Sequence, residues 1–92
     1  MERSKNKEAW LLDGGASSHF VNDKKKFQNE PFPCQQVVVM PNGRLEEVEG
    51  IGMVKFAGIV LKDVLLVSGL GKNFLSVARL TKNGFTVVYN KL

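Results

Sequence analysis

The sequence contains one cysteine, Cys34, and one histidine, His19, among its 92 residues. A single cysteine cannot form an intrachain disulfide, and a structural zinc site needs about four ligands, most often cysteine and histidine. The chain therefore has neither of the staples that small domains commonly use, and we expect it to hold no metal and no cofactor. Because a chain of this length buries only about 60–65% of the surface that its unfolded form exposes, we expect a partner subunit to stabilise it.

Long hydrophobic runs are also absent. No apolar run approaches the roughly 20 residues that a membrane-spanning helix needs, and the N-terminal sequence MERSKNKE is too polar for a signal peptide. Hydrophobic residues make up 43% of the chain and charged residues 24%, as in an ordinary soluble domain, and the length fits one domain. Together with the unpaired cysteine, these features predict an intracellular, cytoplasmic protein without a membrane partner.

Aromatic residues are few, at 9%, which bears on the interpretation of the net charge of +4. A positive charge can indicate a nucleic-acid partner, and an OB-type β-barrel that binds nucleic acid is one alternative for this composition. The main basic run is Lys24, Lys25 and Lys26, and only Phe27 adjoins it. Surfaces that bind single strands usually interleave basic residues with several aromatic ones that stack on bases. The distribution therefore favours a solvated face and argues against a nucleic-acid partner.

Short β-prone runs separated by turn residues predict an all-β fold of about six strands. Asn42-Gly43 lies between the runs 37–40 and 44–48 and is a strong hairpin signal, because both residues tolerate positive φ. Gly50 and Gly52 follow and suggest a bulge or a close approach of two backbone segments. The complete prediction is a loose arm at 1–8, a surface connection at 23–35, and apolar or β-prone runs at 9–12, 19–21, 37–40, 44–48, 53–57, 59–67 and 86–89.

One helix is predicted, over residues 73–82. Apolar residues recur at a spacing of three from Phe74 to Leu80, which places them on one helical face. Asn73, or the lysine before it, would begin the helix, because asparagine is a good N-cap. Asn83-Gly84 would end it in a left-handed conformation.

Asp13 is a candidate catalytic residue because of its neighbours. It ends the apolar run Trp10-Leu11-Leu12 and is followed at once by Gly14-Gly15, so a carboxylate leaves the core and enters a tight turn. Glycines at that place let a substrate or another backbone segment approach closely. Asp-Gly-Gly is also a good turn with no further role, so these residues alone leave both interpretations open.

Three longer segments form an ordered set of motifs: WLLDGGASSHF, MPNGRLEEVEGIGMVKF and LKDVLLVSGLGKNFLSVARLTKNGF. The first resembles the Trp-Leu-Leu-Asp-Ser-Gly-Ala-Ser-Ser-His signature that begins the protease region of Ty1/copia-type retrotransposon Pol polyproteins. The second resembles the Asn-Gly hairpin and Gly-Ile-Gly strand of that region. The third resembles its Leu-x-Asp-Val-Leu segment and its Asn-Leu-Leu-Ser-Val helix. The likeness spans residues 9 to about 89 and occurs in the order of the family.

The resemblance implies a fold that is all-β with one short C-terminal helix. It would be a closed, retropepsin-like β-barrel with a flap hairpin, in which residues 9–92 form the protease domain of a homodimer. The implied catalytic residue is Asp13, within the active-site loop formed by Gly14, Gly15 and Ala16.

Further site residues follow from the same resemblance. The flap that binds substrate would be formed by Met40, Pro41, Asn42, Gly43 and Arg44. The motif at the start of the helix would be Gly71, Lys72 and Asn73. Candidates for apolar subsite walls are Phe32, Val38, Ile51 and Leu70.

Gly14 departs from the family pattern, in which the residue after the catalytic aspartate is normally serine or threonine. In the family, that hydroxyl forms a hydrogen bond across the dimer and braces the two active-site loops. Each missing hydrogen bond costs about 0.5–1.5 kcal/mol, and twofold symmetry counts the loss twice. We therefore expect the fold to survive the change and the dimer or the activity to be weakened by it.

The implied mechanism requires two copies of the chain. Aspartic proteases use two carboxylates that share one proton and hold a water between them, and this chain offers one suitable aspartate. A homodimer with Asp13 of each subunit at the twofold axis would supply the pair. The predicted activity is that of an aspartic endopeptidase, which cleaves a retrotransposon Gag-Pol-type polyprotein in the cytoplasm or within virus-like particles. The alternative is a catalytically impaired or domesticated domain that acts as a dimerisation or peptide-binding module.

Other residues of catalytic types receive structural interpretations. Asp63 lies in an apolar stretch without adjacent glycines. His19 lies close to Ser17 and Ser18, but a catalytic pair needs a third orienting group, and residues this close in sequence cannot readily face each other. Cys34 lies in a proline-rich segment without an obvious basic partner.

Overall fold

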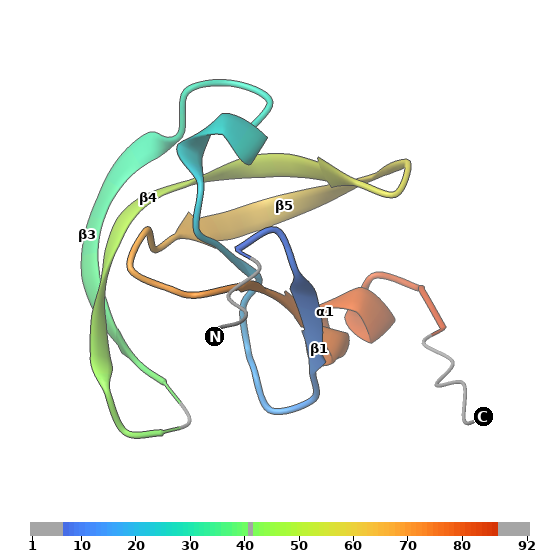
Figure 1. Ribbon diagram of the computed structural model, residues 1–92. Coiled ribbons are helices and arrows are strands. Elements are labelled where there is room, and N and C mark those ends of the chain that lie inside the picture. The colour runs from blue at the N-terminus through green and yellow to red at the C-terminus, as the bar shows by residue number, and fades with distance from the viewer. Residues whose placement is uncertain (1–6, 41, 87–92) are drawn as a thin grey trace.

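The computed structural model describes residues 7–40 and 42–86, which form one mixed β-sheet and two short helical segments (Figure 1). The strand order in the sheet is β1-β6-β2-β5-β4-β3. None of the helices in this part of the chain is long and apolar enough to cross a membrane. The elements are β1 (Trp10–Asp13), β2 (Phe20–Val21), the 3₁₀ helix η1 (Lys24–Lys26), β3 (Phe32–Val39), β4 (Leu45–Phe56), β5 (Ile59–Leu66), β6 (Asn73–Ser76) and α1 (Val77–Lys82).

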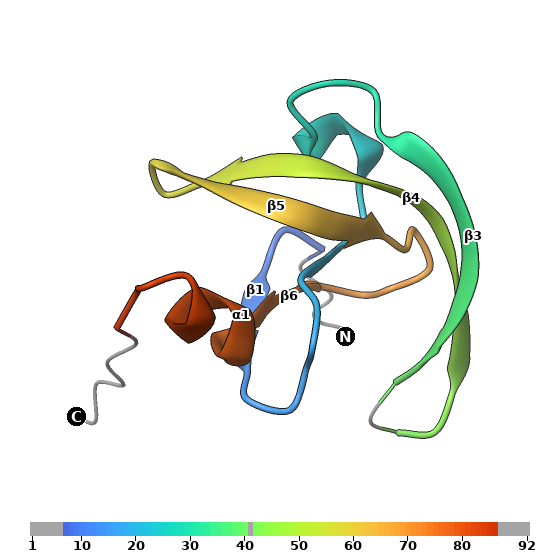
Figure 2. The same cartoon turned by 180° about the vertical axis from the view of Figure 1, so that it is seen from behind.

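The sheet is strongly curled. Figures 1 and 2 show β3 and the first half of β4 bending away from the β4–β5 ribbon, so that the sheet wraps around part of a barrel. The prediction of a mostly β fold with one short helix is confirmed. The predicted closure is not seen in residues 7–40 and 42–86, because β1 and β3 are the two edges of the sheet and do not pair with each other. The described part of the chain is therefore a curled half-barrel.

The predicted hairpin at Asn42-Gly43 is present between β3 and β4. Gly43 has a φ of +86°, and the amide of Met40 donates to the carbonyl of Arg44 at 2.8 Å. The strand before the turn is longer than predicted, because β3 begins at Phe32 within the expected surface connection. β3 is an edge strand, and such a strand tolerates Pro33 because an amide on its free side would have no partner in the sheet.

β4 is one continuous strand of 12 residues and not the two runs predicted on either side of Gly50 and Gly52. The two glycines permit the close approach that the sequence suggested. A Cβ atom on Gly52 would lie 2.9 Å from the ring of Phe27, and one on Gly50 would lie 3.0 Å from the carbonyl oxygen of Phe32. The irregularity in pairing falls on β5, where Lys62 and Asp63 stand opposite the single residue Met53.

The predicted helix at 73–82 is wrong in its first four residues. Asn73–Ser76 form β6, which runs parallel to β1 and antiparallel to β2. Helix α1 begins only at Val77, with Ser76 as its N-cap. The predicted end is confirmed, because Asn83 caps the helix and Gly84 has a φ of +94°. Of the strand predicted at 86–89, residues 87–89 lie outside the described residues, and Thr86 is not in a strand.

The core consists of two apolar clusters, and successive residues of β5 contribute to one and the other in turn. One cluster contains Val64 and Leu66 and is covered by α1 through Leu80. The other contains Leu65, Met40 and Val67 and lies between the β3–β4 hairpin and the loop after β1. Ala16 of that loop packs against the second cluster. The second cluster therefore connects the two segments that the sequence predicted to form the active site.

Candidate active site

Asp13 is the last residue of β1, and its carboxylate turns back onto the loop that follows. The backbone amide of Gly15 donates to Asp13 Oδ1 at 2.9 Å. Asp13 is half-buried, whereas Gly14 and Gly15 are exposed. The tight turn with an amide donor facing the carboxylate is the local geometry that the sequence predicted. It orients the acid and leaves space beside it, since a Cβ atom on Gly14 would meet no atom within 4 Å.

Ser76 braces the Asp13 loop from behind. Its hydroxyl donates to the carbonyl of Ala16 at 2.6 Å and accepts the backbone amide of Arg79 at 3.1 Å. Ser76 is also paired with Asp13 in the parallel register of β1 and β6. One buried side chain therefore joins the Asp13 loop, β6 and the start of α1.

His19 closes the other end of the same loop. It is 1% exposed, and its Nδ1 accepts the backbone amide of Ser76 at 3.0 Å. An accepting Nδ1 must carry no proton, so this contact requires the neutral imidazole. Burial, and in second place the positive charge of Arg79, lower the pKa of His19 below its usual value of 6.5. The contact gives His19 a structural role.

Two asparagine side chains hold β6 in its place between β1 and β2. The backbone amide of Asn22 donates to Asn73 Oδ1 at 2.9 Å, and Asn73 Nδ2 donates to the carbonyl of Ala9 at 3.3 Å. Asn22 Nδ2 donates to the carbonyl of Leu70 at 3.1 Å. Asn73 is fully buried, so its amide must find partners inside the protein.

Asn73 therefore does not have the role that the sequence suggested. The predicted helix-start motif Gly71, Lys72 and Asn73 ends a loop and begins β6, three residues before the N-cap of α1. Sequence reasoning also missed the brace made by Ser76 and the role of Asn22. The nearest signal was the position of Asn73 and Ser76, which flank the apolar residues 74 and 75. Either of these polar residues fits the N-cap of a helix equally well.

A groove lies between the β3–β4 hairpin and the segment that leads into β6. Its floor is apolar, and its rim carries charged and amide side chains. Of the predicted flap residues, Met40, Asn42 and Arg44 line it, Gly43 does not, and Pro41 lies outside the described residues. The lining residues are Met40, Asn42, Arg44, Glu46, Gly69, Leu70, Gly71, Lys72 and Phe74.

The groove and the Asp13 loop are neighbours through Phe74. In the register of β1 and β6, Phe74 stands opposite Leu11, two residues before Asp13. The ring of Phe74 packs edge-on against that of Phe20, with their centroids 6.5 Å apart. Both views show the loop after β1 and the hairpin extending toward the same end of the molecule (Figures 1 and 2). Asp13 itself does not line the groove of the single chain.

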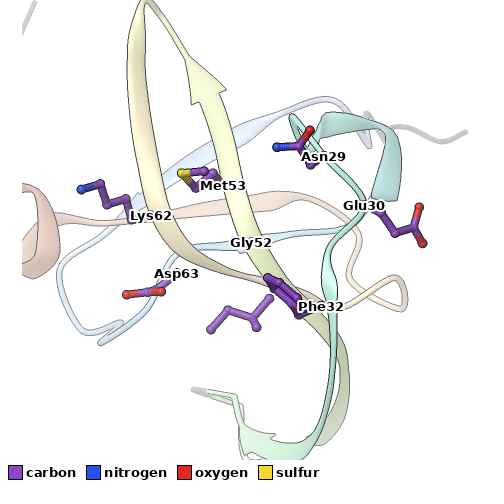
Figure 3. A pocket seen from close by; sticks show the side chains of 8 residues that line it. Asn29, Glu30, Phe32, Gly52, Met53, Lys62 and Asp63 are labelled. Carbon is purple, nitrogen blue, oxygen red and sulfur yellow. The ribbon is translucent and has the colours of Figure 1, made fainter.

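A second depression lies at the irregularity of β5 (Figure 3). Lys62 and Asp63 stand on one side of it, and Asn29 and Glu30 stand on the other. Two of the four predicted subsite residues, Phe32 and Ile51, line this depression and not the groove, and Phe32 is 75% exposed. Of the other two, Leu70 lines the groove, and Val38 packs against the second apolar cluster.

A comparison with known families supports the reading of the fold. A family model described as "Pol polyprotein, beta-barrel domain" matches residues 10–85. The match begins at the first residue of β1 and extends past α1, so it contains the Asp13 loop, the hairpin and the groove. No solved structure matches the chain.

Proposed function

This chain belongs to the family of Pol polyprotein β-barrel domains, and from that membership we propose that it is the aspartic endopeptidase of a retrotransposon Gag-Pol-type polyprotein. The observation that carries the proposal is the setting of Asp13. Its carboxylate stands at the end of a strand, is held by the amide of Gly15, and faces a loop that Ser76 and His19 brace from the core. Such bracing holds a reacting group in one geometry, which acid–base catalysis requires.

The other two aspartates of the chain have structural partners. Asp23 Oδ1 accepts the amide of Lys25 at 2.9 Å and caps η1. Asp63 adopts a φ of +55° at the irregularity of β5 and lies 3.5 Å from the guanidinium of Arg79. Asp13 also accepts an amide, that of Gly15, but it ends a strand, and the open space beside Gly14 leaves room for a substrate.

The proposed reaction uses Asp13 from two copies of the chain. One carboxylate takes a proton from a water whose oxygen attacks the scissile carbonyl, while the other carboxyl donates its proton to the carbonyl oxygen. Two carboxylates that meet at a twofold axis would share one proton, because like charges in contact do not both ionise. The edge strand β1 suits a twofold contact, since Leu11 and Leu12 remain 46% and 42% exposed immediately before Asp13. A partner subunit at this edge would cover part of this exposed apolar surface.

The proposed substrate is an extended peptide that lies along the groove. Met40, Leu70 and Phe74 would contact its apolar side chains, and the hairpin would form one wall of the site. Peptides bind to many β-proteins in this extended form, with pockets that receive alternate side chains.

Substitution of Asp13 tests the proposal. Asp13→Asn keeps the size of the side chain and removes the acid, so we expect peptide cleavage to fall by about 10²–10⁴-fold while the thermal unfolding temperature stays nearly unchanged. Asp23→Asn is the matched control, because asparagine also caps helices and this carboxylate lies elsewhere. Cleavage by Asp13→Asn at the rate of the unsubstituted protein would show that the assignment is wrong.

Gly14 favours a second candidate function, an impaired domain that binds peptide or a second copy without cutting. The loop accepts a side chain at this position, because a Cβ atom on Gly14 would meet nothing within 4 Å and the backbone there is unstrained. If the absence of a hydroxyl at position 14 is what lowers the activity, Gly14→Ser should raise peptide cleavage by about two- to tenfold for each restored hydrogen bond. Gly14→Ala is the control, since it stiffens the backbone without adding a hydroxyl. An equal gain in both variants would assign the effect to backbone freedom.

A further inference from the structure

The rim of the groove has an unequal distribution of charge. Glu46 is the acidic residue of the lining, and its carboxylate is already engaged. Its Oε2 lies 3.8 Å from Arg44 Nη2, and its Oε1 would be 3.1 Å from a Cβ atom on Gly69, so the side chain reaches across to the opposite wall. The side chain of Glu46 is 16% exposed and that of Arg44 is 72% exposed, so Glu46 faces a ligand less than Arg44 does, and its charge offsets one of the two positive charges on the rim.

Lys72 stands on the wall formed by residues 69–72 and is exposed. Within 7–40 and 42–86, no hydrogen bond or ion pair engages its ammonium group. Arg44, on the hairpin side, is also largely exposed beyond its contact with Glu46. Beside the apolar floor of Met40, Leu70 and Phe74, the groove therefore offers a positive charge that no described residue neutralises.

We propose that the groove selects peptides that place an acidic side chain against Lys72, next to an apolar side chain on the floor. The inference rests on the proposed peptide-binding function and specifies its substrate class. A basic side chain at the same place would meet both Lys72 and Arg44, and a neutral one would leave Lys72 as it is. Because the pair would be close to solvent, we expect a preference of about two- to fivefold for Glu over Gln. The preference should weaken at high salt.

The test uses fluorescein-labelled ten-residue peptides with a central Leu-Phe pair and Ser and Gly elsewhere. Glu, Gln or Lys replaces one spacer residue at a time, and fluorescence polarisation measures binding to the uncleaving Asp13→Asn protein. Cleavage of the same peptides by the unsubstituted protein is measured in parallel. At one position we expect the order Glu, then Gln, then Lys in affinity.

Lys72→Glu should reverse this order at that position. Lys55→Glu is the matched control, since Lys55 is exposed on β4 outside the groove and its substitution makes the same change in net charge. Equal affinities for Glu and Gln peptides at every position, or an equal effect of both variants, overturn the inference. Binding with this preference but without cleavage supports the inference and counts against the endopeptidase. Cleavage without any charge preference supports the endopeptidase and overturns the inference about Lys72. Failure of every peptide to bind overturns both the inference and the proposed function.

Discussion

The imidazole of His19 occupies the point where β2, β6 and the Asp13 loop meet. Its Nδ1 accepts the amide of Ser76, and the hydroxyl of Ser76 in turn holds the carbonyl of Ala16. A proton on Nδ1 would remove the acceptor and place two N–H groups against each other. The geometry of the Asp13 loop therefore depends on a residue that cannot be protonated without loss of a buried hydrogen bond.

This dependence predicts a loss of stability in mild acid. Burial, followed by the charge of Arg79, lowers the pKa of His19 in the folded state below 6.5, so the unfolded chain binds a proton more readily than the native protein. The stability that the neutral imidazole contributes is complete above pH of about 6.5 and is lost as the pH falls through the lowered folded-state pKa. Urea unfolding at pH 7.5 and at pH 5 should show a lower midpoint at pH 5.

His19→Asn separates this effect from that of the carboxylates. The Oδ1 of asparagine can accept the amide of Ser76 and does not titrate, so the variant should lose less stability than the unsubstituted protein between pH 7.5 and pH 5. Equal losses in the two proteins would contradict a role for His19 in the acid sensitivity.

At the scale of elements, short sequence signals predicted the turns that they form themselves. They failed where pairing with a distant segment determines the secondary structure. The β3–β4 hairpin was predictable because Asn42-Gly43 specifies its own turn. β6 was not, because Asn73–Ser76 is a strand only through its pairing with Trp10–Asp13, more than 60 residues earlier in the chain. The spacing of apolar residues from Phe74 to Leu80 fits a helix, and tertiary pairing overrode it.

The candidate site divides in the same way. Asp13 and its turn could be identified from adjacent residues, since the carboxylate and its amide donor are two residues apart. The residues that hold the loop could not, because Ser76 is 60 residues from Ala16 and 57 from His19. The glycines of β4 suggested a bulge or a close approach, and they admit Phe27 and Pro31 against a strand that continues through them. The sequence therefore indicates the candidate acid more readily than the residues that hold its loop in place.

At the scale of the molecule, the curled sheet has unpaired edges at β1 and β3 within the described residues. The apolar residues Leu11 and Leu12 are exposed along the first edge, next to the single candidate acid. A half-barrel of this size gains stability when a second copy covers such an edge. The proposed chemistry and the exposed surface thus both favour a twofold assembly at β1.

A mixing experiment tests the assembly through its activity. If each catalytic site needs Asp13 from two copies, a subunit that carries Asp13→Asn should inactivate the subunit with which it pairs. With nine such subunits for each unsubstituted one, at concentrations where the dimer predominates, random pairing leaves about one dimer in a hundred with both acids. Peptide cleavage per unsubstituted subunit should then fall about tenfold, because most of these subunits pair with a variant copy. Asp23→Asn in the same excess should instead raise it about tenfold, since every dimer then keeps both acids and the added subunits cleave as well. Cleavage that stays proportional to the number of unsubstituted subunits would mean that one chain acts alone, and the two-carboxylate mechanism would then have to be abandoned for this domain.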